Sequence, residues 1–469
     1  MLIVGGNQSA AGGYNVDNSV RINRPSSDSM SGVTNGTSTN QNKYTVSFWT
    51  KRGRLSNGST LNIMEGYTGS SDTGTGSIFW RTSEALVIGG YNTNWRITNR
   101  LFRDVSAWYH IVFSVDTTQA TADDRIKVYV NGVEETSFST KNNPSQNSST
   151  GLNNNSAALN LFRRVLFGVN DNHGDGYFSE FCFIDGSALD PTSFGEFDED
   201  SGIWKPIDVS GLTFGTNGFY LQFEDSSALG DDTSGNSNDF TLNNITSIDQ
   251  STDTCTNNFA TWNRLIPPTF TNHNLLDGNL TVEGEVSSQN TAFSTFAVSS
   301  GKWFCEMKLT VEGNATSSVP NFGIASTADF RHADSEAYYE TSGTNIYAGR
   351  VNSAQINHNG SDSGTDLSST PDVGDIMGLA LDLDSGTKTL KFYLNGSLVG
   401  TVNINTDEYC FITAVKEDDN KATVQGNFGG TNTYTVSSGN ADGNGYGNFE
   451  YAVPSGYYAL NTKNLAEYG

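Results

Sequence analysis

A short loop carries four side chains whose types suit metal binding. Asn170, Asp171, Asn172 and Asp175 bring amide and carboxylate oxygens together within one stretch of the chain. Oxygen atoms of this kind are the hard ligands that Ca²⁺ prefers. Surface turns are built from the same residue types. The loop is therefore interpreted either as a calcium site or as an ordinary turn.

Two further segments combine aromatic rings with polar side chains, which is the combination that sugar recognition uses. The first set, in one predicted loop, is Tyr91, Asn94, Trp95 and Arg96. The second set, in a later predicted loop, is Arg331, His332, Tyr338 and Tyr339. Sandwich proteins use loops at the ends of their sheets to bind ligands. An aromatic side chain packed beneath a loop gives the same pattern, so both interpretations stand for each segment.

The residues offer little for catalysis. Glycoside hydrolysis needs two carboxyl groups on one face of a groove. Glu180 and Asp185 are five apart in a predicted strand, and the two-residue period of a strand sends them to opposite faces. His173 lies in a turn beside glycines, which is a poor place to hold a general base. Motifs for a serine nucleophile, a phosphate loop or a metalloprotease are missing, so we expect that the chain is not an enzyme.

The elements that must position these loops are β-strands. In the segment 108–116, Tyr109, Ile111, Phe113 and Val115 alternate with residues of the opposite face, and 125–132 repeats the pattern. Segments 377–384 and 387–396 show the same arrangement far downstream, and each pair closes on Asn-Gly. Period two indicates strands, and Asn-Gly favours the tight turns of hairpins. The sequence therefore predicts two antiparallel β-domains.

Composition supports an all-β protein with several domains. The 469 residues include 50 Gly, only 9 Pro, and 16% charged residues, which is typical of strands joined by polar turns. One hydrophobic core rarely grows beyond roughly 250 to 300 residues. Two sandwiches of similar size fit this length, and the aromatic content of 11% predicts cores rich in Phe, Tyr and Trp.

Charge and segment lengths limit the possible partners. The net charge is −25 and no cluster of Lys or Arg stands out, so nucleic-acid binding is not expected. No run approaches the roughly 20 apolar residues of a membrane span, and the segment beginning at Met1 lacks the basic start of a signal peptide. We expect a soluble chain made without ordinary secretion.

The separated cysteines, with Cys182 and Cys305 inside predicted strands, indicate buried free thiols.

The predicted fold class is two antiparallel β-sandwich (jelly-roll) domains in tandem with an ordered connector. Residues 1–225 form the first sandwich, with predicted strands at 44–49, 77–80, 85–88, 108–116, 125–132, 164–167, 177–184 and 219–223. Residues 226–274 are rich in Asp, Ser and Asn and are predicted to be the connector. Residues 275–469 form the second sandwich. Asp190 before a proline predicts a single short helical turn.

The first half resembles laminin G-like, concanavalin A-like jelly rolls. The resemblance rests on three segments in order: 44–51, 108–116 with 127–133, and 176–186. Such domains often hold a calcium ion at their loop ends, so the resemblance implies Ca²⁺ at the loop of Asn170, Asp171, Asn172 and Asp175. Concanavalin A-like folds also include glycosidases, whose Glu-x-Asp-x-x-Glu pattern this sequence lacks.

The second half resembles a SPRY domain. Segments 300–307, 372–382 with 390–396, 426–429 and 454–460 stand in the order of that family's landmark strands. The two halves and the segments 229–240 and 256–260 between them are together similar to fibre and appendage proteins of marine tailed bacteriophages. That resemblance implies a virion protein that is made in the host cytoplasm and released by lysis without a signal peptide.

The expected function is that of a non-enzymatic bacteriophage virion protein, a tail or head fibre or appendage, with recognition modules. Its expected partners are other virion proteins and a host-surface glycan or protein, without nucleic acid or membrane. A closed homo-oligomer is expected, with a trimer as the first hypothesis. Apart from Ca²⁺, no cofactor is expected. The alternatives are a glycan depolymerase hidden in the first sandwich and a purely structural decoration of the capsid or tail.

Overall fold

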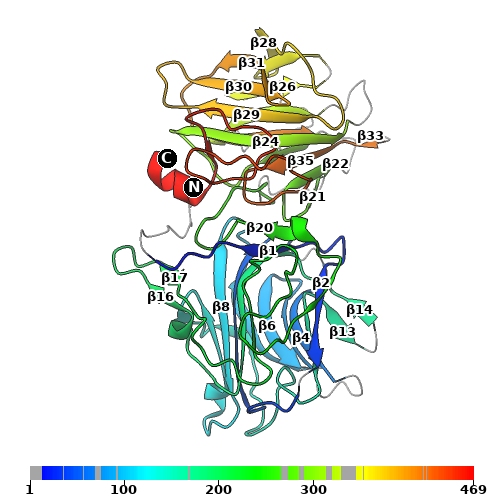
Figure 1. Cartoon of the computed structure of the whole chain (residues 1–469), viewed down its shortest axis with the longest axis vertical. Coiled ribbons are helices and arrows are strands. Elements are labelled where there is room, and N and C mark those ends of the chain that lie inside the picture. The colour runs from blue at the N-terminus through cyan, green and yellow to red at the C-terminus, as the bar shows by residue number, and fades with distance from the viewer. Residues whose placement is uncertain are drawn as a thin grey trace. The chain divides into compact units, whose positions relative to one another are not determined.

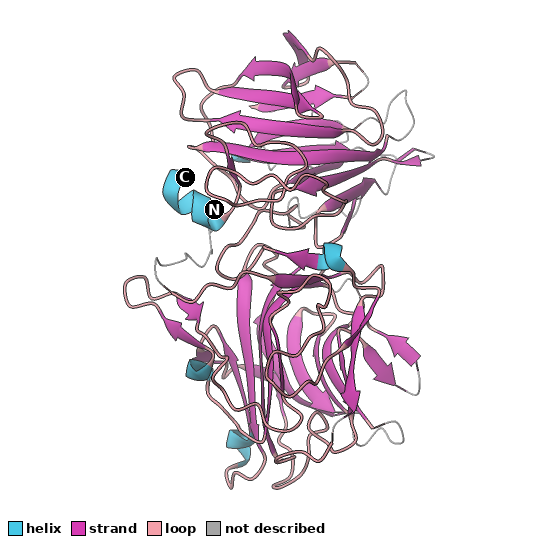
Figure 2. Ribbon diagram, in the orientation of Figure 1, coloured by secondary structure: helices cyan, strands magenta, loops and turns pink. Residues whose placement is uncertain are grey.

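The computed structural model describes residues 13–469 except 35, 56–57, 69–74, 91–92, 167–168, 266–272, 285–289, 313–319, 329–344, 352, 416 and 419. The chain divides into two compact units (Figure 1). The N-terminal unit spans Asn7–Thr256, and the C-terminal unit contains Asn257–Gly469. Strands dominate both units (Figure 2), and this confirms the all-β fold class.

The N-terminal unit is built on two antiparallel sheets. The first sheet contains, in spatial order, β10 (Val133–Glu134), β9 (Ile126–Val130), β8 (Trp108–Asp116), β3 (Lys43–Arg52), β15 (Gly176–Asp185), β1 (Ser19–Ile22) and β20 (Gln250–Ser251), and β18 (Phe219–Leu221) also pairs with β15. The second contains β11 (Phe138–Lys141), β7 (Thr93–Leu101), β6 (Ala85–Gly90), β5 (Gly76–Trp80), β4 (Leu61–Tyr67), β12 (Ala158–Leu161), β2 (Ser29–Thr34) and β19 (Thr241–Asn243).

Alternating side chains from both sheets meet in one core. Phe48, Phe113 and Phe181 enter it from the first sheet, and Ile78 and Trp80 enter it from the second. All five are nearly or fully buried. Because the strands alternate, every second residue of the second sheet lies on the face turned away from this core. Two short hairpins are added to the sandwich: β13 (Arg164–Leu166) with β14 (Val169–Asp171), and β16 (Gly195–Phe197) with β17 (Trp204–Pro206).

The C-terminal unit repeats this architecture. One sheet contains, in spatial order, β21 (His273–Leu276), β22 (Thr281–Gly284), β35 (Thr423–Asn427), β24 (Lys302–Val311), β29 (Ile376–Asp382), β30 (Thr389–Leu394) and β31 (Ser397–Asn403), with β36 (Tyr458–Ala459) parallel to β24. The other contains β23 (Asn290–Phe293), β32 (Tyr409–Val415), β25 (Asn321–Ser326), β26 (Ile346–Arg350), β27 (Gln355–His358) and β28 (Ser361–Asp366). A small hairpin joins β33 (Glu417–Asp418) to β34 (Asn420–Lys421).

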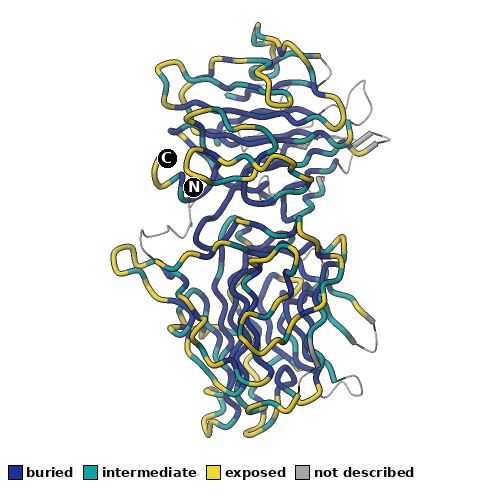
Figure 3. The backbone as a smooth tube through the Cα atoms, viewed as in Figure 1, coloured by how far each residue is buried: buried dark blue, intermediate teal, exposed yellow. Residues whose placement is uncertain are grey.

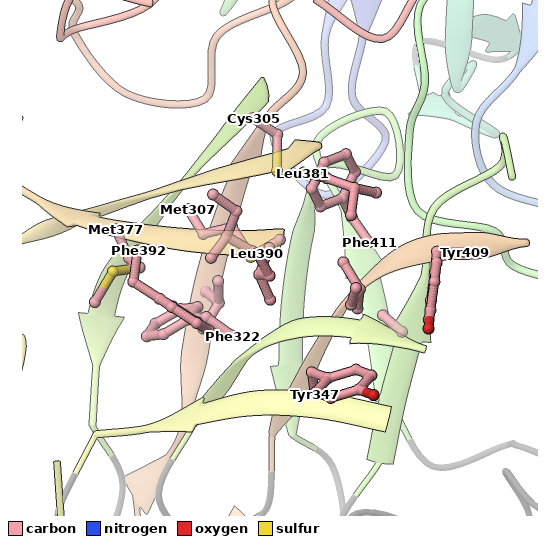
Figure 4. Packing of buried hydrophobic residues seen from close by; sticks show 14 of the residues in the cluster. Cys305, Met307, Phe322, Tyr347, Met377, Leu381, Leu390, Phe392, Tyr409 and Phe411 are labelled. Carbon is pink, nitrogen blue, oxygen red and sulfur yellow. The ribbon is translucent and has the colours of Figure 1, made fainter. Parts of the chain in front are cut away.

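The core of the C-terminal unit also draws on both sheets. Figure 4 shows Met307 and Phe392 from one sheet facing Phe322 and Phe411 from the other. Figure 3 shows buried residues along the strands of each unit and exposed residues in the loops. All four cysteines of the chain are buried free thiols. No described helix is long and apolar enough to cross a membrane.

The paired hairpins form where the sequence predicts them. Strand β8 pairs with β9, and β29 pairs with β30. Both Asn-Gly turns have positive φ at both residues, 48° and 78° at Asn131 and Gly132, and 46° and 80° at Asn395 and Gly396. These turns lead from β9 into β10 and from β30 into β31. The repeated pattern therefore reports a repeated supersecondary unit.

The predicted connector divides between the two units. In the N-terminal unit, β19 pairs with β2 and β20 pairs with β1, so residues 241–251 complete both sheets of that sandwich. Trp262 packs in the core of the C-terminal unit. Helical turns among the described residues include η2 (Ala122–Arg125), η3 (Pro191–Ser193), η4 (Ser247–Asp249) and α1 (Thr462–Tyr468). Asp190 caps η3 through a bond from the Thr192 amide, as predicted, whereas α1 was not predicted.

Candidate functional site

A groove of about 590 Å³ lies on the outer face of the second sheet of the N-terminal unit. Strands β4 and β5 form its floor, the end of β6 and the start of β7 form one side, and the hairpin β13–β14 contributes the other. Its lining residues are Thr60, Asn62, Glu65, Thr75, Ser77, Phe79, Gly90, Thr93, Asn94, Arg164 and Asn172. Most of them carry hydroxyl or amide groups, and Phe79 supplies an aromatic ring.

A β-bulge in β4 sets the polar floor of the groove. The pairing of β4 with β5 shifts between Asn62 and Met64. Because of this extra residue, Ile63 and Met64 are both buried in the core. Asn62 and Glu65 consequently share the outer face, although they are three residues apart. Without the bulge, the two-residue period would place them on opposite faces.

Glu65 is a buried acid on the floor of this groove. Its residue is only 1% exposed, and its Oε2 accepts a hydrogen bond of 2.6 Å from the backbone N–H of Val165 in β13. Burial raises the pKa of Glu65 to about 8, despite that bond and the nearby positive charges of Arg164 and Arg163. The carboxyl group is therefore mostly protonated and uncharged at neutral pH.

Both arginines near Glu65 are bound to other groups. The Arg164 guanidinium donates two hydrogen bonds to Asp171, of 2.7 and 2.6 Å, across the hairpin β13–β14. The Arg163 guanidinium donates to Asn160 Oδ1 and to the Ser31 hydroxyl. The Arg164–Asp171 pair is therefore neutral overall.

Some hydroxyl and amide groups of the lining form hydrogen bonds within the described part of the protein, and others do not. Ser77 Oγ donates to Asn62 Oδ1 at 2.9 Å, and the Asn62 amide nitrogen donates to the Arg163 carbonyl at 2.5 Å. Thr75 is 5% exposed, and its buried hydroxyl has no hydrogen-bond partner among the described residues.

The segment around Tyr91 contributes one described side chain to the groove. Asn94 lines it, whereas Trp95 is half-buried and packs against the core. Arg96 is 1% exposed and donates to the Ile126 and Trp95 carbonyls and to Asn143 Oδ1. It therefore holds neighbouring backbone together and is not available to an external ligand. Tyr91 lies outside the described residues.

The second predicted binding segment lies in residues 329–344, which are not described. Nothing is therefore known of the positions of Arg331, His332, Tyr338 and Tyr339. Their assignment as ligand contacts stays a prediction.

The predicted calcium loop does not present a set of free oxygen ligands. Both oxygens of Asp171 bind Arg164. Asp175 is 6% exposed and accepts the backbone N–H groups of Arg54 at 2.6 Å and Arg24 at 3.2 Å. Asn170 is exposed in β14 and Asn172 lines the groove. Within the described part of the chain, no cluster of three or more His, Cys, Asp or Glu could hold a metal ion. Amide and backbone carbonyl oxygens also bind Ca²⁺, so calcium at this loop stays a prediction.

The other acidic candidates serve the fold. Glu180 is buried in a bulge of β15, where it accepts hydrogen bonds from Tyr220 at 2.5 Å and Tyr14 at 3.3 Å. Asp185 is also buried and accepts from the backbone N–H groups of Thr39 and Asn217. The two carboxyl groups thus bind different partners within the protein and do not form a catalytic pair.

Sequence reasoning missed Glu65 and Thr75. The strand β4, which carries Glu65, was not among the predicted strands, because the bulge breaks its alternation. The presence of an acidic residue among apolar neighbours, in Leu61-Asn-Ile-Met-Glu-Gly-Tyr67, was the available signal. A charged residue within a buried strand is rare unless it is paired or functional.

The solved structures that are similar to this chain each match only part of it. The SPRY domain of human HERC1 is 14% identical over 35% of this chain and 94% of its own, with a TM-score of 0.28. A pentraxin from Limulus polyphemus is 16% identical over 37% of this chain and 78% of its own, with a TM-score of 0.28. A proposed carbohydrate-binding protein from Bacteroides ovatus is 15% identical over 49% of this chain and 59% of its own, with a TM-score of 0.34.

A family model gives more direct information than these structures. The comparison with curated proteins found no match. The model of the concanavalin A-like lectin/glucanases superfamily matches residues 26–180. This range includes every lining residue of the groove. The N-terminal unit therefore contains a laminin G-like, concanavalin A-like jelly-roll domain, with the β-sandwich fold of carbohydrate-recognition modules.

Proposed function

We propose that the N-terminal unit is a non-enzymatic recognition module that binds a glycan in the groove on its second sheet. One observation carries this proposal. The groove combines hydroxyl and amide side chains from strands β4, β5 and β7 with the ring of Phe79, and it lies within a concanavalin A-like domain. Sugars present hydroxyl groups and apolar ring faces, which such a lining matches.

The shape and charge of the groove are consistent with this ligand. Ligand pockets typically have volumes of about 300–1,000 Å³, and this groove has about 590 Å³. Its described charged groups are Arg164, which is paired with Asp171, and Glu65, which is buried. An open, polar and nearly neutral groove suits part of an oligosaccharide chain.

We further propose that the setting is a bacteriophage virion, in a fibre or appendage. Support comes from the order of a laminin G-like domain and a SPRY-like segment, which resembles such proteins. Its partners would be neighbouring virion proteins and a glycan or protein on the host surface. A closed homo-oligomer, first of all a trimer, would add avidity, because linked weak sites reach effective concentrations in the millimolar range.

A glycan array with matched variants tests the binding proposal. Thr93 is an exposed groove residue in β7, and Thr241 is an exposed residue of β19 in the same sheet outside the groove. We expect Thr93→Trp to remove glycan binding and Thr241→Trp to leave it unchanged, because only the first fills the groove. Equal binding by both variants and the wild-type chain would show that the groove is not the site.

A glycan depolymerase is the second candidate, and Glu65 is the observation in its favour. A carboxyl group with a pKa of about 8 has the protonation state of a general acid at neutral pH. Its nearest acidic neighbour in the hairpin, Asp171, is bound through both oxygens to Arg164. New reducing ends released from a bound glycan by the wild-type chain, and not by Glu65→Gln, would favour hydrolysis over simple binding.

A further inference from the structure

We propose that Glu65 acts as an uncharged hydrogen-bond donor to the ligand, so that the groove selects uncharged glycans and releases them when Glu65 ionises. This inference rests on the proposed function and assigns a specificity-determining role to one side chain. Four observations support it: the position of Glu65, its surroundings, the neighbouring Thr75, and the charge of the lining.

Glu65 presents one carboxyl oxygen to the protein and leaves the other for a ligand. Its Oε2 accepts the Val165 N–H, which fixes the carboxyl group against β13. Among the hydrogen bonds of the described residues, none reaches its Oε1. The side chain lines the groove while the residue is 99% buried. A ligand atom in the groove would thus meet a positioned carboxyl group that has capacity for another hydrogen bond.

The surroundings of Glu65 favour its protonated form. Among the described residues, the charged groups that act most strongly on it are Arg163, Arg164 and Asp171, all of them in or next to the hairpin β13–β14. Neither arginine forms an ion pair with Glu65 within the described structure; Arg164 binds Asp171, and Arg163 binds neutral oxygens. A buried carboxylate without a paired cation is strongly disfavoured, and the group takes up a proton instead.

Thr75 adds a second polar group to the same lining. Its hydroxyl is buried and has no partner within the part of the chain that the structure describes. Thr75 immediately precedes β5, while Glu65 lies on the neighbouring strand β4, paired with Ser77. A hydroxyl both donates and accepts, and a protonated carboxyl group donates through its O–H. Together they can bind the hydroxyl and ring oxygens of a sugar that has no charge.

The described lining has no free cation for an acidic sugar. Arg164, the one basic residue that contributes to the described lining, is already neutralised by two hydrogen bonds to Asp171. A uronic or sialic acid carboxylate would lose its hydration there without gaining an ion pair. The expected ligand class is therefore a neutral oligosaccharide with hydroxyl, ether or amide oxygens.

The test is the affinity of the full chain for a neutral array-selected oligosaccharide between pH 6 and pH 9.5. Since binding requires the proton on Glu65, the Kd should rise about tenfold from pH 7 to pH 9. Glu65→Gln keeps a donor at every pH, so its Kd should change little across the range. Thr75→Val removes the hydroxyl at constant shape, and it should weaken binding at every pH while keeping the wild-type pH dependence.

The outcomes separate this inference from the proposed function. A wild-type Kd that does not change with pH, together with groove-dependent binding, would overturn the role of Glu65 and leave glycan recognition in place. Stronger binding of an acidic than of a matched neutral sugar would also overturn it. Binding that Thr93→Trp does not affect would instead contradict the groove as the site. Carboxyl ¹³C titration of the free chain gives a check without ligand: one Glu resonance should titrate near pH 8 and vanish in Glu65→Gln.

Discussion

His110 shows how a residue with catalytic potential can be purely structural. It is 1% exposed and lies between the rings of Trp49 and Trp204, with centroid distances of 4.7 and 5.9 Å. Its Nδ1 accepts the Trp204 Nε1–H, so its Nε2 carries the proton and donates to Ser47 Oγ at 2.9 Å. A serine beside a histidine suggests a nucleophile and its base. Here both are buried, and an indole occupies the place of an orienting acid.

The burial of His110 predicts how the free energy of unfolding depends on pH. Burial lowers the pKa of His110 to about 3, from an ordinary value of about 6.5. At a pH between these two pKa values, His110 binds a proton in the unfolded chain but not in the folded chain. The free energy of unfolding therefore decreases as the pH falls through this range. Relative to His110→Asn, the wild-type chain should lose up to about 1.4 kcal/mol of unfolding free energy per pH unit between pH 6 and 4. Denaturant titrations at several pH values measure this difference.

The comparison with His110→Asn isolates one histidine from the buried acids, which titrate in both proteins. Asparagine keeps an acceptor near the Nδ1 position for the Trp204 N–H. If the difference in unfolding free energy between the two proteins stayed constant from pH 7 to pH 4, then His110 would be accessible to protons in the folded chain, and its structural assignment would be wrong.

Among the elements, the Asn-Gly turns have the strictest requirements. Gly132 has φ +78°, and a Cβ at this position would lie 2.3 Å from the ring of Trp204. Gly235 has φ +89° with nothing within 4 Å of such a Cβ. Both glycines belong to the N-terminal unit, so they allow backbone strain to be distinguished from a steric clash.

The prediction is that Gly132→Ala destabilises the N-terminal unit more than Gly235→Ala does. Positive φ alone costs an L-residue roughly 1–2 kcal/mol, and this applies to both variants. The clash with Trp204 adds to it only at position 132, with overpacking typically costing about 1–3 kcal/mol. Thermal unfolding of both variants measures the difference. Equal destabilisation would mean that the β9–β10 turn can move away from Trp204.

The sequence predicted the elements whose side chains alternate without interruption. The strands β8, β9, β29 and β30 could be identified because each keeps period two up to its turn. The strand β4 could not, because its bulge places Ile63 and Met64 on one face. The groove depends on that bulge and on the hairpin β13–β14, which is brought to β4 by tertiary contacts such as the Val165–Glu65 bond. The sequence predicted Asn94 and Asn172 as binding residues from their residue types. It did not predict that the two side chains line the same groove.

Among the described residues, buried acids with a strongly raised pKa outnumber buried histidines with a strongly lowered pKa. Burial raises the pKa of Asp28 to about 6, of Glu180 to about 7 and of Glu65 to about 8. In the C-terminal unit it also raises the pKa of Glu306, which accepts the backbone N–H groups of Glu450 and Tyr451. Between the unfolded pKa of an acid and its raised folded pKa, the folded chain binds the extra proton, so stability decreases as pH rises.

We therefore predict that the chain is more stable at pH 5 than at pH 8. The titration of His110 raises the free energy of unfolding over part of this pH range. The opposite contribution from the three acids of the same unit is larger. The net charge of −25 adds repulsion that also grows as acids ionise. Scanning calorimetry at the two pH values tests this, and Glu65→Gln should show a smaller decrease between them. Unfolding temperatures that rise from pH 5 to pH 8 would contradict the assignment of these acids as neutral.

The central claim is that the groove on the N-terminal sandwich binds a glycan, and the most direct test is a crystal structure of the full chain with an array-selected neutral oligosaccharide. The account predicts sugar density over Phe79, with a ligand oxygen within hydrogen-bond distance of Glu65 and of Thr75. Density at another surface, with the groove holding only solvent, would contradict it.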